Sequence, residues 1–172
     1  TSWGKKSVWP RPKTAQILSK ILGRIFWHLL GSDTLNTVTD KSRVLRVLVY
    51  SDNAKVRNTV KTSIGQRPSE EISSVEIYDV ATEPALIKVM DTKQFDLVIL
   101  DGETSPAGGL GICRQLKDEI YNCPPVLVLV ARVDDRWLAT WSRADAVVAH
   151  PIDPRALVKA VLSLLTPAQS IA

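Results

Sequence analysis

The stretch FDLVILD at residues 95–101 is largely apolar and ends in an aspartate. Two other runs, RVLVY at 46–50 and PVLVLVA at 125–131, are also continuously apolar, without alternation between polar and apolar positions. Strands buried on both faces require such runs, and parallel sheets covered by helices on both sides provide that burial. Residues 95–101 therefore predict a central strand of a parallel sheet.

Segments with helical spacing separate the apolar runs along the rest of the chain. We expect strands at 46–50, 74–80, 95–101, 125–131 and 146–150, and helices at 53–64, 83–91, 109–120, 135–143 and 154–165. Five alternating strand and helix units predict an α/β fold with an open, doubly wound sheet. Such sheets bind ligands at the carboxyl ends of their strands, so the residues that follow each strand are candidates for a site.

The two ends of the chain differ from this alternating region. We assign residues 1–31 to a basic arm, 32–43 to a polar linker, 44–166 to the α/β domain and 167–172 to a short tail, and we expect no output domain. The net charge is +4, yet residues 1–32 hold six Lys and Arg and no Asp or Glu, so the remainder is slightly acidic. A basic segment of this kind favours an acidic partner surface.

The basic arm contains a predicted amphipathic helix over residues 13–30. On a helical wheel its Ile and Leu residues share a wide apolar arc, and its Lys and Arg residues lie opposite. Three locations stay open for it: a membrane interface, an apolar surface of another protein, or the α/β domain of the same chain. The few basic residues disfavour nucleic acid. The candidate docking residues are Trp3, Lys5, Lys6, Trp9, Arg11, Lys13, Ile17, Lys20, Ile21, Arg24, Phe26 and Trp27.

Two carboxylates are predicted at the carboxyl edge of the sheet. Asp52 follows the first strand and Asp101 ends the third, so both are expected on one edge. Such a pair can hold a hard cation such as Mg²⁺, and one member could accept a phosphoryl group. The alternative is that each aspartate only caps the helix that follows it, because Asp is a favoured cap.

Four segments carry a resemblance to a known family. VLVYSDNAKVR at 47–57, DLVILD at 96–101, GLGICRQLK at 109–117 and ADAVVAHPIDP at 144–154 resemble, in order and spacing, the receiver domain of bacterial two-component response regulators. The resemblance implies a receiver or flavodoxin-like sheet of strand order 2-1-3-4-5. It also implies that Asp101 matches the phosphoacceptor, and that Pro151 matches a proline that usually follows a cis peptide bond.

The chain departs from this family where the phosphoryl group is handled. Ser51 stands in place of the first of two adjacent acids, His150 in place of a lysine, and Val130 in place of a Ser or Thr. Each missing preorganised donor typically costs ~10²–10³ in rate, and an imidazole carries less positive charge at pH 7 than an ammonium. We therefore predict no enzymatic activity and no cofactor. The degenerate pocket comprises Asp101, Asp52, Ser51, Val130, His150 and Pro151. We expect no bound metal, and the alternative is a Mg²⁺ ion at Asp52 and Asp101.

A pair of tryptophans lies on the predicted helix at 135–143. Trp137 and Trp141 are four residues apart and therefore share one face of that helix. One interpretation is that one of them packs into the core while the other shields its edge. The other is that the pair anchors a partner, because Trp is enriched in binding hot spots.

A closer resemblance concerns LDGETSPAGGLG, NCPPVLVLVAR and RWLATWSRADAVVAHPIDP. These segments look like orphan response-regulator-like proteins of actinobacteria that accompany respiratory complex I, the proton-pumping NADH dehydrogenase. That resemblance implies an accessory subunit held peripherally at the cytoplasmic side of the cell membrane. Two alternatives stay open: a stand-alone response regulator phosphorylated on Asp101, and a pseudo-receiver that senses a small ligand in the old pocket.

Overall fold

The computed structural model describes residues 44–165 except 71 and 73. The strands are β1 (Val44–Tyr50), β2 (Ser74–Val80), β3 (Leu97–Asp101), β4 (Val126–Val130) and β5 (Ala146–Ala149). The α-helices are α2 (Ala54–Ile64), α3 (Glu83–Thr92), α4 (Gly109–Glu119), α5 (Arg136–Ser142) and α6 (Pro154–Leu165), with a 3₁₀ turn at Val133–Asp135. The predicted arm at 1–31, the linker at 32–43 and the tail at 167–172 lie outside the described residues.

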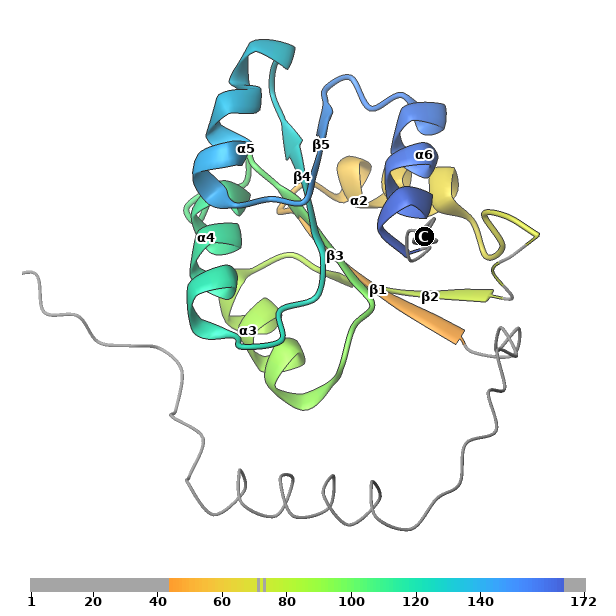
Figure 1. Cartoon of the computed structure of the whole chain (residues 1–172), viewed down its shortest axis with the longest axis horizontal. Coiled ribbons are helices and arrows are strands. Elements are labelled where there is room, and N and C mark those ends of the chain that lie inside the picture. Colours follow the sequence, from red (N-terminus) through yellow and green to blue (C-terminus); the bar gives the residue numbers. More distant parts are fainter. Residues whose placement is uncertain (1–43, 71, 73, 166–172) are drawn as a thin grey trace, which may run out of the picture. The chain divides into compact units, whose positions relative to one another are not determined.

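The five strands form one parallel sheet of order β2-β1-β3-β4-β5, which confirms the predicted fold class (Figure 1). Every predicted element within the described range is present, and its boundaries differ by no more than two residues. The largest differences are two residues, at β1 and at β3. Strand β1 begins two residues early because Val44–Arg46 pair with Ser74–Glu76 of β2, and β3 begins two residues late, at Leu97. None of the helices in this part of the chain is long and apolar enough to cross a bilayer.

The central strands are buried from both sides. All five residues of β3 and all five of β4 are buried. In Figure 1, α2 and α6 cover one face of the sheet, and α3, α4 and α5 cover the other. Alternate strand residues such as Val49, Ile99 and Leu129 pack with α2 and α6 in a single apolar cluster. The residues between them point to the opposite face, because side chains along a strand alternate in direction.

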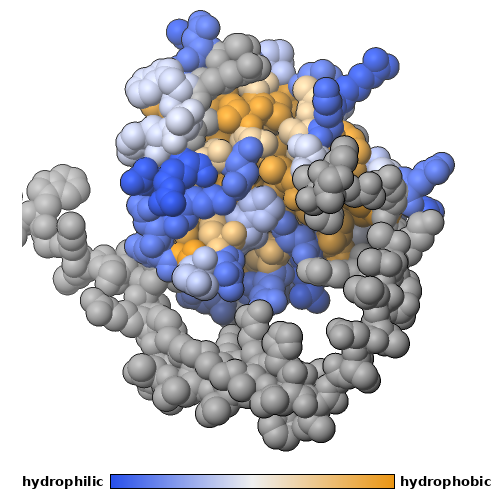
Figure 2. Space-filling view, viewed as in Figure 1, coloured by the Kyte–Doolittle hydropathy of each residue, from blue (hydrophilic) through white to orange (hydrophobic). Residues whose placement is uncertain are grey.

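The edge strand β5 is covered less completely. Its residues Ala146, Val147 and Ala149 are only half-buried, and Val148 alone is buried. Figure 2 shows apolar surface reaching the exterior between α5 and α6, where β5 runs. The carboxyl ends of β1, β3, β4 and β5 come together at one edge of the sheet, and this edge carries the candidate site.

Candidate functional site

The predicted pocket residues follow successive strands at the carboxyl edge. Ser51 comes directly after β1, Asp101 ends β3, Val130 ends β4 and His150 follows β5. The register places these ends level, because Asp101 lies opposite Leu129 and Val130 lies opposite Ala149. The fold therefore brings together residues that are far apart in the chain, such as Ser51 and Asp101, which are separated by 50 positions.

Asp101 is the buried centre of the pocket, with 2% of its surface exposed. The hydroxyl of Ser51 donates a hydrogen bond of 2.7 Å to Oδ2 of Asp101. The backbone N–H of Glu103 donates one of 3.1 Å to Oδ1. Both carboxylate oxygens thus accept hydrogen bonds from neutral donors of the protein itself.

His150 lies beside this carboxylate without bonding it. Its Nε2 is 3.7 Å from Oδ1 of Asp101, and within the described part of the chain this buried nitrogen has no hydrogen-bond partner. The distance exceeds that of an N–H···O hydrogen bond, which is about 3.2 Å at most. The peptide bond between His150 and Pro151 is cis, as the resemblance implied for this proline.

Val130 closes the pocket from β4. Its side chain is 1% exposed and has no polar atom, while its carbonyl oxygen accepts a hydrogen bond of 2.8 Å from the backbone N–H of His150. An apolar side chain here cannot form a hydrogen bond with a phosphoryl group on Asp101. Phosphorylation of Asp101 therefore cannot shift β4 through such a bond. The end of β4 is thus tied to β5 through the backbone alone.

Asp52 is exposed and contacts the loop that follows β3. Its Oδ2 accepts a hydrogen bond of 3.3 Å from the backbone N–H of Ser105, in the loop after β3. The proposal that Asp52 caps the following helix is wrong. The N-cap of α2 is Asn53, whose side chain accepts from the N–H of Lys55 at 2.9 Å. A helix has one N-cap, and the residue closer to its first turn takes that position.

The receiver fold implies a Mg²⁺ ion at this edge, and the replacement of an acid by Ser51 leaves fewer carboxylates to hold one. Mg²⁺ requires near-octahedral oxygen coordination and is usually bound by one or two carboxylates together with water and substrate phosphate. Here the hydroxyl proton of Ser51 points at Asp101, and Asp52 is bonded to the neighbouring loop. In the described part of the chain, no three His, Cys, Asp or Glu side chains form a group that could hold a metal.

Helix α4 begins in close contact with the end of β3. A Cβ at Gly109 would lie 2.5 Å from the carbonyl oxygen of Asp101. Only glycine allows this approach, so the position of Asp101 depends on the glycine-rich segment that opens α4.

Tyr50, at the end of β1, contacts the loop between β3 and α4. Its hydroxyl donates a hydrogen bond of 2.7 Å to the carbonyl oxygen of Ala107 in that loop. Burial, and then the charges of Glu83, Asp52 and Asp101, raise the pKa of this tyrosine.

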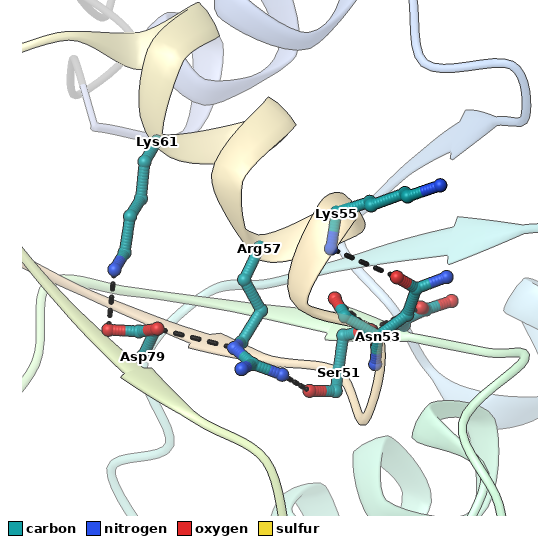
Figure 3. Close-up of polar contacts among 7 residues, drawn as sticks. Ser51, Asn53, Lys55, Arg57, Lys61 and Asp79 are labelled. Carbon is teal, nitrogen blue, oxygen red and sulfur yellow. Dashed lines mark hydrogen bonds and ion pairs between the residues drawn. The ribbon is translucent and has the colours of Figure 1, made fainter.

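A basic cluster beside the pocket was not predicted from the sequence. Arg57 of α2 donates to the carbonyl oxygen of Ser51 at 2.6 Å and to Asp79 of β2 at 3.2 Å (Figure 3). Lys61 pairs with the same carboxylate at 2.6 Å. The hydrogen bond from Lys61 is the largest cause that lowers the pKa of Asp79. The four-residue spacing of Arg57 and Lys61 in the sequence places both on one face of a helix. Their acidic partner, Asp79, could be identified only from the pairing of β1 with β2.

The two tryptophans of α5 are on the outside of the domain. Trp137 is 66% exposed and Trp141 is 54% exposed. The interpretation that one of them packs into the core is therefore wrong, because α5 turns that face away from the sheet. The role of the pair as a partner anchor stays a prediction.

A five-stranded parallel sheet of order β2-β1-β3-β4-β5, with a buried aspartate at the end of its middle strand, is the arrangement found in receiver domains. This chain belongs to the response-regulator family. It is 52% identical over 126 residues to an uncharacterised response regulatory protein of Mycobacterium tuberculosis, covering 73% of this chain and 95% of the relative. It is 25% identical to the transcriptional regulatory protein ResD of Bacillus subtilis, covering 73% of this chain and 50% of the relative.

Solved structures agree on the fold. The chemotaxis response regulator CheY4 of Vibrio cholerae matches with a TM-score of 0.61 and 17% identity, covering 72% of this chain and all of that one (100%). A signal receiver domain from Bacteroides fragilis matches with a TM-score of 0.60 and 20% identity, covering 73% and 100%. No family model matches the sequence. Receiver domains generally act as signalling modules and not as enzymes. This chain contains the receiver domain of a response regulator.

Proposed function

We propose that this chain is a pseudo-receiver, a non-catalytic accessory subunit of a membrane-bound respiratory assembly. The observation that carries the non-catalytic part is the hydrogen bond of 2.7 Å from Ser51 to the buried carboxylate of Asp101. The neutral hydroxyl of Ser51 occupies a carboxylate oxygen of Asp101 that, in a functional phosphorylation site, would face a metal ion or an ammonium group. The protein thus stabilises the unmodified aspartate and provides no charge for a phosphorylated one.

The electrostatic reason is the charge that develops during phosphoryl transfer. Transfer to a carboxylate proceeds with charge on the phosphoryl oxygens, and catalysis consists almost entirely of positioning and charge neutralisation. At this site Ser51 offers no anionic ligand for a metal, Val130 offers no hydroxyl, and His150 lies 3.7 Å away without a hydrogen bond. The retained and buried Asp101 favours the alternative function, a response regulator that still accepts phosphate.

The first prediction separates these two functions. Full-length protein incubated with Mg²⁺ and acetyl phosphate at neutral pH is expected to keep its intact mass, because the site lacks the groups that stabilise the transferred phosphoryl group. Mass spectrometry of the intact chain measures this. Stoichiometric gain of one phosphoryl group, absent in Asp101→Asn, would establish the alternative function and refute the pseudo-receiver.

Attachment is proposed to take place through residues 1–31 at the cytoplasmic side of the membrane. This segment contains six Lys and Arg, no acidic residue and three of the five tryptophans of the chain. A single interfacial helix gives modest affinity for lipid, and stable anchoring usually requires a second contact. We therefore expect a protein partner in addition to lipid. The resemblance to complex I-associated orphan regulators favours the proton-pumping NADH dehydrogenase as that partner.

A further inference from the structure

A shallow groove runs along the outer side of α6 and is bounded by the end of α2. It has a volume of about 500 Å³ and is lined by Ser63 of α2 and by Pro154, Arg155, Val158, Lys159 and Leu162 of α6. The lining residues of α6 recur at helical spacing, so the groove extends over more than two turns. Val158 and Leu162 are half-buried and form an apolar floor, and Arg155 and Lys159 are exposed beside it.

The two helices that form the groove carry charge of one sign. The sequences of α2 and α6 contain five Lys and Arg and no Asp or Glu. Arg57 and Lys61 both pair with Asp79, which compensates one of their two charges. In the described part of the chain Lys55, Arg155 and Lys159 have no ion pair. Of these three, Arg155 and Lys159 line the groove, and the carboxylate of Asp153 lies at its start, where it accepts from the backbone N–H of Arg155. The groove therefore combines an apolar floor with two basic side chains on its border.

We propose that this groove binds an amphipathic helix of a partner protein whose apolar stripe is flanked by Asp and Glu. Helices bind in apolar grooves through residues at i, i+3, i+4 and i+7, a repeat that matches the groove residues on α6. Charge complementarity requires acidic residues beside the stripe of the partner helix.

The other occupants agree less well with these features. Residues 1–32 of the same chain contain six Lys and Arg and no Asp or Glu, and a second copy would bring another pair of basic helices, so both would oppose like charges. An anionic bilayer would satisfy the charges, but its planar surface does not fill a groove between two helices. This inference concerns a surface separate from Asp101 and from residues 1–31, so its failure would leave the proposed function in place.

The groove is tested in cells by photo-crosslinking. A benzoylphenylalanine replaces Val158, or in a second variant Ser63, in the full-length chain, and a variant at the exposed Asp91 of α3 is the control. The expected result is one protein adduct from both groove positions and not from Asp91. Its cross-linked peptide, identified by mass spectrometry, is expected to be an amphipathic helix with acidic flanks.

Charge reversal then tests the complementarity. Arg155→Glu with Lys159→Glu is expected to weaken the adduct, and the binding of the synthetic cross-linked peptide to the full-length chain, by about ten-fold or more. The matched control, Lys88→Glu with Arg132→Glu, makes the same change in net charge at two exposed residues away from the groove and is expected to change neither. Adducts to lipid, to a second copy or to residues 1–43 of the same chain would overturn the inference. So would a cross-linked peptide without acidic flanks, or no adduct above the Asp91 control.

Discussion

The triple variant Ser51→Asp, Val130→Thr, His150→Lys is expected to accept a phosphoryl group on Asp101 from acetyl phosphate in the presence of Mg²⁺. The three replacements return a carboxylate, a hydroxyl and an ammonium to positions around a carboxylate that is already buried at the end of β3. Each preorganised group of this kind contributes ~10²–10³ in rate. Together they should raise the rate of phosphorylation by at least about 10³-fold over the unaltered chain.

The measurement is a time course of intact mass for the triple variant and for the unaltered chain. A fourth change, Asp101→Asn, is the control that identifies the acceptor, and a thermal melt shows that the variant is folded. A folded triple variant that gains no phosphoryl group would show that these three residues do not explain the loss of transfer. Equal phosphorylation of the unaltered chain and the variant would show that no transfer had been lost.

Leu127→Ala is expected to destabilise the protein far more than Asp101→Ala. Leu127 is 0% exposed in β4, and the register places it between Ile99 of β3 and Ala146 of β5. Removing such a side chain loses its burial and leaves a cavity, at a cost of about 2–5 kcal/mol in the free energy of unfolding. Asp101→Ala removes the acceptor of two hydrogen bonds, and an unsatisfied buried donor costs about 1–3 kcal/mol. The same change removes a buried charge, which offsets part of that cost, so the net loss should be smaller than that of Leu127→Ala.

Thermal melts of the two single variants compare these effects in the same buffer. The midpoint of Leu127→Ala is expected to be the lower of the two by several degrees. A lower midpoint for Asp101→Ala would contradict the description of Asp101 as a residue of a former phosphorylation site. It would mean that the hydrogen bonds from Ser51 and Glu103 are a main source of stability.

The features that the sequence predicted well depend on local pattern. The apolar runs at 95–101 and 125–131 became the fully buried strands β3 and β4, because a strand covered on both faces is apolar along most of its length. Once the strand order was known, the position of each strand end placed Ser51, Asp101, Val130 and His150 on one edge. The resemblance to receivers provided that order.

Other features depend on tertiary packing that no local pattern specifies. The spacing of Trp137 and Trp141 showed that they share a face, but the short helix α5 left open which way that face turns. Asp52 and Asn53 are both good helix caps, and the choice of Asn53 followed from the geometry of the chain between β1 and α2. The cluster of Arg57 and Lys61 around Asp79 required the register of β1 against β2.

Recovery of the NADH dehydrogenase from solubilised membranes tests the proposed attachment most directly. Full-length chain and a chain lacking residues 1–31, each with the same affinity tag, are used as bait, and the enzyme is measured by NADH oxidation and by its subunits. We expect recovery with the full-length chain, little loss of it at high salt because packed contacts are poorly screened, and none with the truncated chain. Equal recovery with both forms would show that the arm is not the docking element. Recovery with neither would contradict the assignment to this assembly.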